Sequence, residues 1–240
     1  MTTLFISDLH LDSARPGITK LFGEFVDNEA RDADALYILG DLFEAWVGDD
    51  DPSDVGNLVA VKLRDLHNHG VPVFFIRGNR DFLLGDAYAA RAGMTILPDP
   101  AVVMLHGTPT LLMHGDTLCT GDLAYQQFRE TTRHPDWQET FLAQPLDARL
   151  AFAQRARAAS ATHQAGLQAQ GAMDAITDVA PATVDATFDR YGIDTIIHGH
   201  THRPATHAHA HRRRIVLGDW YEQGSVLRAV EAGLTLSPLT

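Results

Sequence analysis

Seven residues of metal-ligand type follow apolar segments at separate places in the chain: Asp8, His10, Asp41, Asn79, His114, His200 and His202. They provide two carboxylates, one amide and four imidazoles, and no thiolate. A single ion takes about four to six ligands, so this set suggests two ions that share one ligand. Asp41 is the expected bridge because a carboxylate has two oxygens. The mixture of nitrogen and oxygen donors favours manganese, iron, cobalt or zinc over calcium.

The run TIIHGHTHRP, residues 195–204, contains three histidines at alternate positions: His198, His200 and His202. The β-branched residues before His198 favour a strand, and Gly199 allows the chain to turn sharply where that strand ends. Imidazole is the commonest metal ligand among side chains. A histidine-rich loop that binds no metal would have the same local sequence, so the assignment depends on the rest of the chain.

Two apolar patterns alternate through the first part of the chain. Short apolar runs predict strands, and apolar residues at helical spacing predict helices. The predicted strands cover residues 2–7, 35–39 and 71–76, and the predicted helices cover residues 18–30, 55–67 and 86–92. This alternation predicts a mainly parallel sheet covered by helices. Because ligand sites of such sheets lie at the carboxyl ends of the strands, we expect the polar clusters that follow the strands to converge.

The second half of the chain changes character twice. Residues 95–113 favour strands, with a turn at 106–109, whereas residues 122–191 contain no obvious strand and predict several helices. Strand patterns return at residues 194–197, 214–218, 225–230 and 234–236. We predict an α/β fold with a β-sandwich core, flanked by helices, that comprises residues 1–121 and 192–240. Residues 122–191 form a helical insert, or lid, in this prediction.

The composition argues against several classes of protein. With 45% apolar residues the 240-residue chain can bury a core, and its formal net charge of −12 argues against binding to nucleic acid. The single cysteine, Cys119, permits no internal disulfide and indicates a reducing compartment. The sequence shows neither a signal-peptide pattern nor the ~20 apolar residues of a membrane span. We expect a cytoplasmic protein that is soluble or peripheral to a membrane.

The ligand-type residues lie in five short motifs in a fixed order: D-x-H, G-D, G-N-R-D, H-G-D and G-H-T-H. Together these motifs resemble the metallophosphoesterase family, also called the calcineurin-like phosphoesterases. The resemblance covers the chain outside the insert and implies a dinuclear metal site with a bridging water as the nucleophile. It implies that one metal is held by Asp8, His10, Asp41 and His202, and the other by Asp41, Asn79, His114 and His200. His198 precedes the last motif and is expected to pack or to support a ligand.

Arg80 occupies a position at which many members of the family carry a histidine that protonates the leaving group. Arginine remains protonated and cannot act as a general acid, although it can clamp phosphate oxygens. We therefore expect a leaving group that needs no proton, as in cleavage of a diphosphate, rather than the alkoxide of a simple monoester. In the alternative, Arg80 is only a surface partner of Asp81. The expected catalytic residues are Asp41, Asn79, Arg80 and His114.

Longer stretches resemble one branch of the family, whose members act on UDP-2,3-diacylglucosamine in lipid A synthesis: LFISDLHL, ALYILGDLFEAWVGDDD, FIRGNRDFLLG, LLMHGDTLCTGD and IIHGHTHRP. This resemblance implies hydrolysis of the diphosphate to UMP and 2,3-diacylglucosamine 1-phosphate (lipid X) by attack at the α-phosphorus. It implies two Mn²⁺ ions per chain and a lipid-linked nucleotide sugar as the substrate. It also implies peripheral association with the cytoplasmic face of a Gram-negative inner membrane, and we expect the protein to be a monomer.

A substrate with two acyl chains needs an apolar cavity beside the metals, and the insert is expected to provide it. The predicted cavity residues are Trp46, Phe82, Phe128, Phe141 and Phe152, which could instead pack the insert onto the core. The predicted contacts to the polar part of the substrate are Asn79, Arg80, Asp122, Arg157, Ser160, Gln164 and His200. The family commonly carries a lysine shortly after the serine that matches Ser160, whereas this chain has none there.

Two surface segments have simpler interpretations. The run 206–214 alternates like a strand with His207, His209 and His211 on one face, which predicts a solvated edge, with lipid contact as the alternative. The acidic run 49–51 is expected to be a solvated loop.

Two other functions stay open at this stage. The protein could be a metallophosphoesterase that acts on another nucleotide diphosphate or on a phosphodiester. It could also be a binding scaffold that keeps the fold without the chemistry, but such a scaffold would be expected to have lost ligands.

Overall fold

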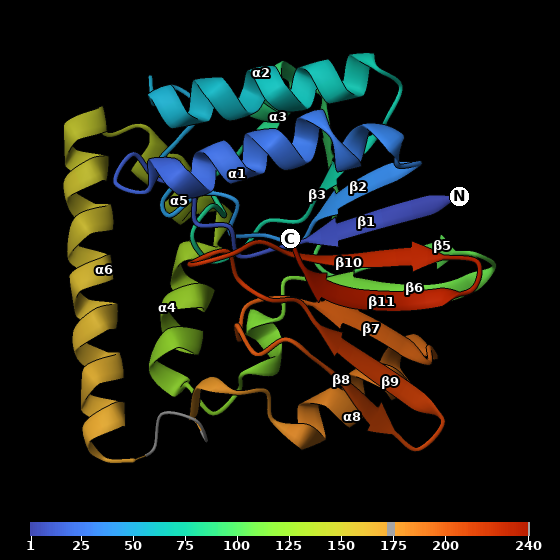
Figure 1. Ribbon diagram of the computed structural model, residues 1–240. Coiled ribbons are helices and arrows are strands. Elements are labelled where there is room, and N and C mark those ends of the chain that lie inside the picture. The colour runs from blue at the N-terminus through green and yellow to red at the C-terminus, as the bar shows by residue number, and fades with distance from the viewer. Residues whose placement is uncertain (172–175, 240) are drawn as a thin grey trace.

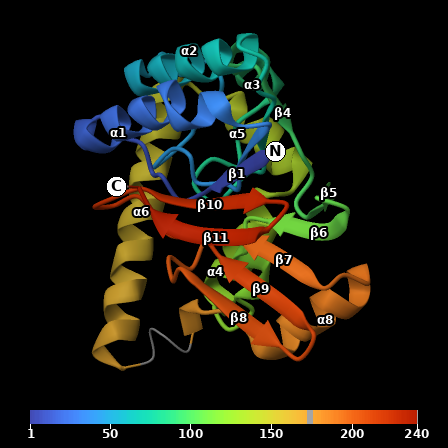
Figure 2. The ribbon, with the colours of Figure 1, turned by 45° about the vertical axis from the view of Figure 1, so that its right-hand side comes forward.

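Two β-sheets pack face to face in the computed structural model, which describes residues 1–171 and 176–239 (Figures 1 and 2). The first sheet has the strand order β11-β10-β1-β2-β3-β4, and the second has the order β5-β6-β7-β9-β8. The strands of the first sheet are β1 Thr2–Ile6, β2 Ala35–Ile38, β3 Val73–Phe75, β4 Met94–Ile96, β10 Ser225–Val230 and β11 Gly233–Pro238. Those of the second are β5 Ala101–Leu105, β6 Thr108–Met113, β7 Thr195–His198, β8 Ala205–His209 and β9 Arg212–Val216.

Helices cover the outer face of each sheet. Helices α1 (Pro16–Asp27), α2 (Asp54–Asn68) and α3 (Asp86–Ala92) lie over the first sheet, and α8 (Pro181–Tyr191) lies against the second (Figure 1). Short 3₁₀ helices cover Glu29–Asp32 and Asp116–Leu118. The remaining helices, α4 (Leu123–Thr132), α5 (Pro135–Leu142) and α6 (Leu146–Ala169), stand beside the sheets.

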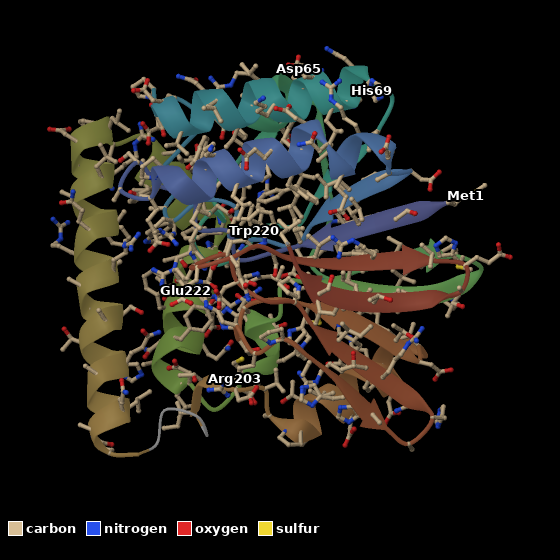
Figure 3. All side chains as sticks on the ribbon, in the orientation of Figure 1. Met1, Asp65, His69, Arg203, Trp220 and Glu222 are labelled. Atoms are coloured by element: carbon tan, nitrogen blue, oxygen red, sulfur yellow. The ribbon has the colours of Figure 1, made fainter. Side chains whose placement is uncertain are left out.

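Strand β1 is buried on both faces because its side chains alternate between two cores. Leu4 and Ile6 belong to the core under α1 and α2, whereas Phe5 belongs to the core between the two sheets. Trp220 lies beneath α1 (Figure 3), where its ring contacts Phe22 and Phe25. Successive side chains of such a strand are all apolar, because both of its faces are buried. This continuous apolar pattern is what predicted β1.

The parallel pairing expected from the sequence is confirmed for the strands that precede the polar clusters. Strand β1 pairs in parallel with β2, β2 with β3, and β6 with β7. Their carboxyl ends therefore meet along one side of the sandwich. Arg203 and Glu222, which follow β7 and β9, lie on the side of the sheets that faces α4 (Figure 3).

The described part of the predicted insert divides into two environments. Helices α4, α5 and α6 lie on the side of the strands' carboxyl ends, and α6 forms the outer wall at the left of Figure 1. Helix α8 instead packs Val184 and Phe188 against Met113 and Ile196 of the second sheet.

The run 206–214 includes a solvated edge strand, β8, as predicted, but its histidines do not all share one strand face. The run 206–214 forms the hairpin β8–β9 rather than one strand, so His211 lies in its turn and shares no strand face with His207 and His209. The acidic run 49–51 lies in a loop, as predicted, with Asp50 exposed and Asp49 and Asp51 partly exposed. Asp49 also accepts hydrogen bonds from Trp46 Nε1–H at 3.1 Å and from two backbone N–H groups at 2.9 Å. Asp49 thus satisfies donors in its own loop and at the start of α3.

Within residues 1–171 and 176–239, no helix combines the length and the apolar character that crossing a bilayer requires.

Candidate metal centre and adjoining pocket

The backbone is left-handed at most of the predicted metal ligands. Positive φ angles occur at Asp8 (56°), His10 (50°), Asp41 (52°), His200 (69°) and His202 (55°). Residues with a Cβ rarely adopt this conformation, and those that do cluster at functional sites. The turns are held by backbone hydrogen bonds, since Asp8 N–H donates to Gly40 O at 3.1 Å and His10 N–H donates to Asp41 O at 2.9 Å.

Two motif glycines allow the aspartates to approach the neighbouring backbone. A Cβ at Gly78 would overlap Asp41 Oδ1, and one at Gly199 would overlap Asp8 Oδ2. The space that Gly199 leaves lets His200 N–H donate to Asp8 Oδ2 at 2.9 Å. The glycines of G-N-R-D and G-H-T-H are therefore required by close packing around the two carboxylates.

Asp8, His10 and His202 form a first group of facing ligand atoms, all within 4.8 Å of one another. His202 Nε2 lies 3.3 Å from Asp8 Oδ1 and 3.2 Å from His10 Nε2. These three residues come from the ends of β1 and β7, which lie in different sheets. The sandwich is thus what brings this group together.

Asp41, Asn79, His114 and His200 form a second group beside the first. Asn79 Oδ1 lies 2.8 Å from His114 Nε2 and 2.8 Å from His200 Nδ1, so one amide oxygen faces two imidazoles. The same two ring nitrogens are 3.2 Å apart.

Asp41 lies between the two groups and presents one carboxylate oxygen to each. Its Oδ2 is 3.7 Å from His10 Nε2, and its Oδ1 is 3.7 Å from His114 Nε2. This is the arrangement that a bridging carboxylate requires. Asp8, Asp41 and His114 also offer ligand atoms within 4.8 Å of one another, so the two groups are continuous.

The chemistry of this cluster fits divalent metal ions. The facing ring nitrogens of His10 and His202, and those of His114 and His200, carry lone pairs that repel unless a proton or a cation lies near them. Asp8 Oδ1 is buried beside the first pair without a well-aligned hydrogen-bond donor among the described residues. Buried carboxylates that face imidazoles in this way are typical ligands of manganese, iron, cobalt and zinc.

The carboxylates create a field that favours positive charge at the centre of the cluster. Burial disfavours a charged His114, but the nearby Asp41, Asp8 and Asp116 carboxylates outweigh it and raise the pKa of His114 to about 9. Burial, together with the neighbouring His114, lowers the pKa of His200 to about 4. A cation in this field would take the place of the proton that His114 otherwise holds.

Carboxylates behind the first group were missed by sequence reasoning. Glu44 Oε2 lies 2.8 Å from His10 Nδ1, and Asp219 Oδ2 lies 3.5 Å from His202 Nδ1. His114 Nδ1 instead faces the backbone oxygen of Leu39 at 2.9 Å. Glu44 is three residues after Asp41 in the sequence, but that spacing carries no signal of a contact to His10, which only the fold creates.

Arg80 is held beside the cluster by its backbone. Its N–H donates to Asp41 Oδ1 at 2.8 Å, and its guanidinium Nε is buried without a hydrogen-bond partner in the described part of the chain. Asp81 is fully buried and accepts backbone hydrogen bonds from Leu42 and Gly78 at 2.7 and 2.8 Å. The alternative that Arg80 is only a surface partner of Asp81 is therefore wrong.

His198 lies behind the cluster with both ring nitrogens facing protein atoms. Nδ1 donates to Gly199 O at 2.8 Å, and Nε2 accepts from Arg214 Nη1 at 3.0 Å. Burial, with the adjacent Arg214 charge, lowers the pKa of His198 to about 3. The prediction that His198 packs or supports a ligand is confirmed.

A pocket of about 910 Å³ opens beside the cluster and runs between α4, α5 and α6. The ligand candidates that line it include His10, Asp41, Asn79, His200 and His202, and Arg80 lines it too. The predicted polar contacts from the insert also line it: Asp122, Arg157, Ser160 and Gln164. The structure therefore brings the predicted polar contacts to one pocket.

The predicted cavity aromatics Trp46, Phe82, Phe128, Phe141 and Phe152 line the same pocket. Several form a continuous aromatic wall, in which the ring centroids of Trp137 and Phe141 are 4.8 Å apart and those of Phe141 and Phe152 are 5.1 Å apart. Trp46 also packs on Phe43 and Tyr88 and is 3% exposed, so it serves the core as well. The pocket thus joins the polar cluster to an aromatic wall.

Comparison with known proteins places this site in a family. The sequence profile of the calcineurin-like phosphoesterases matches residues 1–204. The chain belongs to this family. Its β-sandwich, with helices on both faces, agrees with the predicted α/β fold.

Calcineurin-like phosphoesterases of closely similar sequence are known. A protein of Xanthomonas campestris pv. campestris (strain B100) named UDP-2,3-diacylglucosamine hydrolase is 63% identical over 100% of this chain and 99% of its own length. A protein of the same name from Stenotrophomonas maltophilia (strain R551-3) is 61% identical with the same coverage. Among solved structures, an archaeal phosphodiesterase aligns over 100% of both chains with a TM-score of 0.51 and 13% identity, which shows the shared fold.

Proposed function

We propose that this protein hydrolyses the diphosphate bond of UDP-2,3-diacylglucosamine and releases UMP and 2,3-diacylglucosamine 1-phosphate. The observation that carries this proposal is that the polar cluster and the aromatic wall line one pocket. The volume of this pocket is about 910 Å³. The names of relatives at 61–63% identity support the same substrate. A pocket that joins a polar cluster to an aromatic wall suits a diphosphate attached to acyl chains.

The cofactors in this proposal are two Mn²⁺ ions per chain. The first group with Asp41 would hold one ion, and the second group would hold the other, so that Asp41 is shared. When bound, such ions lower the pKa of water and neutralise charge on phosphoryl oxygens. The chain supplies a mixed nitrogen and oxygen donor set, without thiolate, that suits this metal.

Arg80 contributes charge and orientation in this reaction. Its guanidinium lines the pocket beside Asn79 and the cluster, where it can hold phosphoryl oxygens of the substrate. Because it keeps its proton, it stabilises developing negative charge and does not protonate a leaving group. Attack at the α-phosphorus expels a sugar 1-phosphate, which leaves as an anion without a proton.

The insert recognises the rest of the substrate in this proposal. Asp122 and Ser160 face the pocket from α4 and α6 and suit the hydroxyl and amide groups of an acylated glucosamine. Gln164 lies one helical turn after Ser160, and His163 Nε2 lies 3.4 Å from Asp122 Oδ1 across the two helices. The aromatic wall then takes the acyl chains, whose burial drives binding.

We extend the proposal to location and assembly. A substrate with two acyl chains resides in a membrane leaflet, so the protein would act as a monomer docked peripherally on the cytoplasmic face of the inner membrane. Vesicle flotation with and without diacyl substrate tests the docking, and sedimentation equilibrium tests the assembly.

The deciding assay incubates purified protein with UDP-2,3-diacylglucosamine and Mn²⁺ and measures UMP. We expect UMP to form, to disappear with EDTA and to return with added Mn²⁺. UDP-glucose, which shares the nucleotide and lacks the acyl chains, is the matched control. Equal release of UMP from both substrates would refute the role of the aromatic wall, and no release from either would refute the proposed activity.

A further inference from the structure

Glu44 is a buried carboxylate beside the metal cluster that the ligand set does not use. Glu44 is 9% exposed and lies in the loop that follows β2 and carries Asp41. One of its oxygens, Oε2, lies 2.8 Å from His10 Nδ1. The other, Oε1, pairs with Arg157 Nη2 of helix α6. A single carboxylate therefore contacts a ligand candidate on one side and the insert on the other.

The contact to His10 determines which ring nitrogen is free. A carboxylate this close to Nδ1 favours a proton on that nitrogen, which leaves the lone pair on Nε2. His10 Nε2 is the atom that faces Asp41 Oδ2 at 3.7 Å and His202 Nε2 at 3.2 Å. Glu44 thus holds His10 in the tautomer and the orientation that a metal ligand needs.

The contact to Arg157 fastens the insert to the same carboxylate. Arg157 Nη1 donates to the backbone oxygen of Glu44 at 3.1 Å, while Nη2 pairs with its side chain. The two residues are 113 positions apart in the sequence. Arg15 Nη2 lies 3.7 Å from Glu44 Oε2, and Arg15 also donates to the backbone oxygen of His10.

Cationic side chains lie beside Glu44. The guanidinium groups of Arg157 and Arg15 face the carboxylate, so its negative charge is compensated although the side chain is mostly buried. If α6 moved away from the core, Glu44 would lose Arg157, which contacts both its side chain and its backbone oxygen. A partly buried carboxylate that loses its cation is costly, so the position of α6 affects how firmly Glu44 holds His10.

We propose that Glu44 is a positioning residue that couples helix α6 to His10, so that metal binding and the docking of α6 strengthen each other. This inference rests on the proposed metal site. The coupling is reciprocal by thermodynamic necessity: whatever α6 docking adds to metal affinity, the metal adds to α6 docking. The insert would then be held in place over the pocket when the metal centre is loaded.

The first experiment titrates metal-free protein with Mn²⁺ alone in a calorimeter. We expect Arg157→Gln to weaken Mn²⁺ binding roughly fivefold or more, although Arg157 touches no proposed ligand, and Glu44→Gln to weaken it roughly 10- to 100-fold. Arg155→Gln is the matched control, because Arg155 lies on the same helix and lines the same pocket. We expect it to leave the affinity unchanged, whereas an equal loss in both arginine variants would refute the specific coupling.

The second experiment measures amide hydrogen exchange and uses the wild-type chain first. We expect Mn²⁺ to slow exchange in α6 around residue 157 and to have no such effect in Glu44→Gln. The wild-type measurement needs no variant, so it tests the coupling even if Glu44→Gln folds poorly. Exchange in wild-type α6 that ignores bound Mn²⁺ would overturn the proposal.

The two experiments separate this inference from the proposed function. If the wild-type chain binds no Mn²⁺, the proposed metal site is refuted and the coupling falls with it. If wild type binds Mn²⁺ and hydrolyses substrate while Arg157→Gln binds Mn²⁺ as tightly as wild type, only the coupling is refuted. A double-mutant cycle with Glu44→Gln and Arg157→Gln should show non-additive losses of affinity, and strictly additive losses would contradict a shared carboxylate.

Discussion

Removal of the Arg80 side chain is the perturbation that best separates phosphoryl chemistry from metal binding. The contact from Arg80 to the cluster runs through its backbone N–H, 2.8 Å from Asp41 Oδ1, and alanine keeps this group. Among the described residues no carboxylate forms an ion pair with its guanidinium, and the nearby Glu44 keeps Arg157 and Arg15 as partners when Arg80 is replaced by alanine. We therefore expect Mn²⁺ stoichiometry and thermal stability to match wild type.

The cost should appear in turnover. Loss of one positioned donor to a developing negative charge typically costs about 10²- to 10³-fold in rate, which is roughly 2.7–4 kcal/mol. Arg80→Lys keeps the charge but loses the two-pronged geometry, so we expect an intermediate rate.

The assay follows UMP release under saturating UDP-2,3-diacylglucosamine, with bound manganese measured on the same samples. Arg155→Ala is the matched control, since Arg155 also lines the pocket and is exposed. If Arg80→Ala loses metal while its turnover per bound metal is unchanged, the proposed role of Arg80 in phosphoryl transfer is refuted. A rate within threefold of wild type would refute it too.

Three other changes have distinct expected results. Asp41→Asn should abolish hydrolysis and reduce bound manganese, because its two oxygens face the two ligand groups; full activity would refute the bridging role. Phe141 is only 4% exposed and stacks on Trp137, so Phe141→Ala should lower the free energy of unfolding by about 3 kcal/mol in denaturant titrations. The same variant should raise KM for the diacyl substrate. Unchanged values of both quantities would contradict the proposed role of the aromatic wall. Buried His198 stays neutral down to its pKa of about 3, while the unfolded chain takes up a proton below 6.5. His198 should therefore contribute a loss of about 1.4 kcal/mol of stability per pH unit to the metal-free protein as pH falls through this window, in addition to the contribution of His200, whose pKa is about 4. His198→Asn should lose its own contribution, and an unaltered slope would show that another group causes it.

The first three strands and their parallel pairing could be predicted because their apolar runs are largely buried. Strand β1 shows this well, since Leu4 and Ile6 enter one core and Phe5 enters the other. The hairpin at 205–216 was predicted less well, because alternation along an exposed edge leaves the position of a turn undetermined. Positive φ at Ala210 breaks that edge into two strands, and no glycine marks the site.

The identity of the candidate ligands was readable from the sequence, but their division into groups was an inference by resemblance. Asn79 shows why, because its oxygen faces both His114 and His200, which enter from strands of another sheet. The outer partners Glu44 and Asp219 carried no detectable pattern. Their roles depend on distances of a few ångströms between distant segments, and spacing along the chain does not encode these distances.

The sequence by itself determined the kind of chemistry, the parallel strands that carry it and the family. Ligand type and apolar periodicity are local properties, so they survive in the linear order of residues. Only the tertiary structure decided that Asp41 presents one oxygen to each group, that Asp81 serves the backbone and that Arg157 reaches Glu44. These are contacts between side chains from separate elements. Their geometry exists only once the two sheets have packed and the insert lies against them.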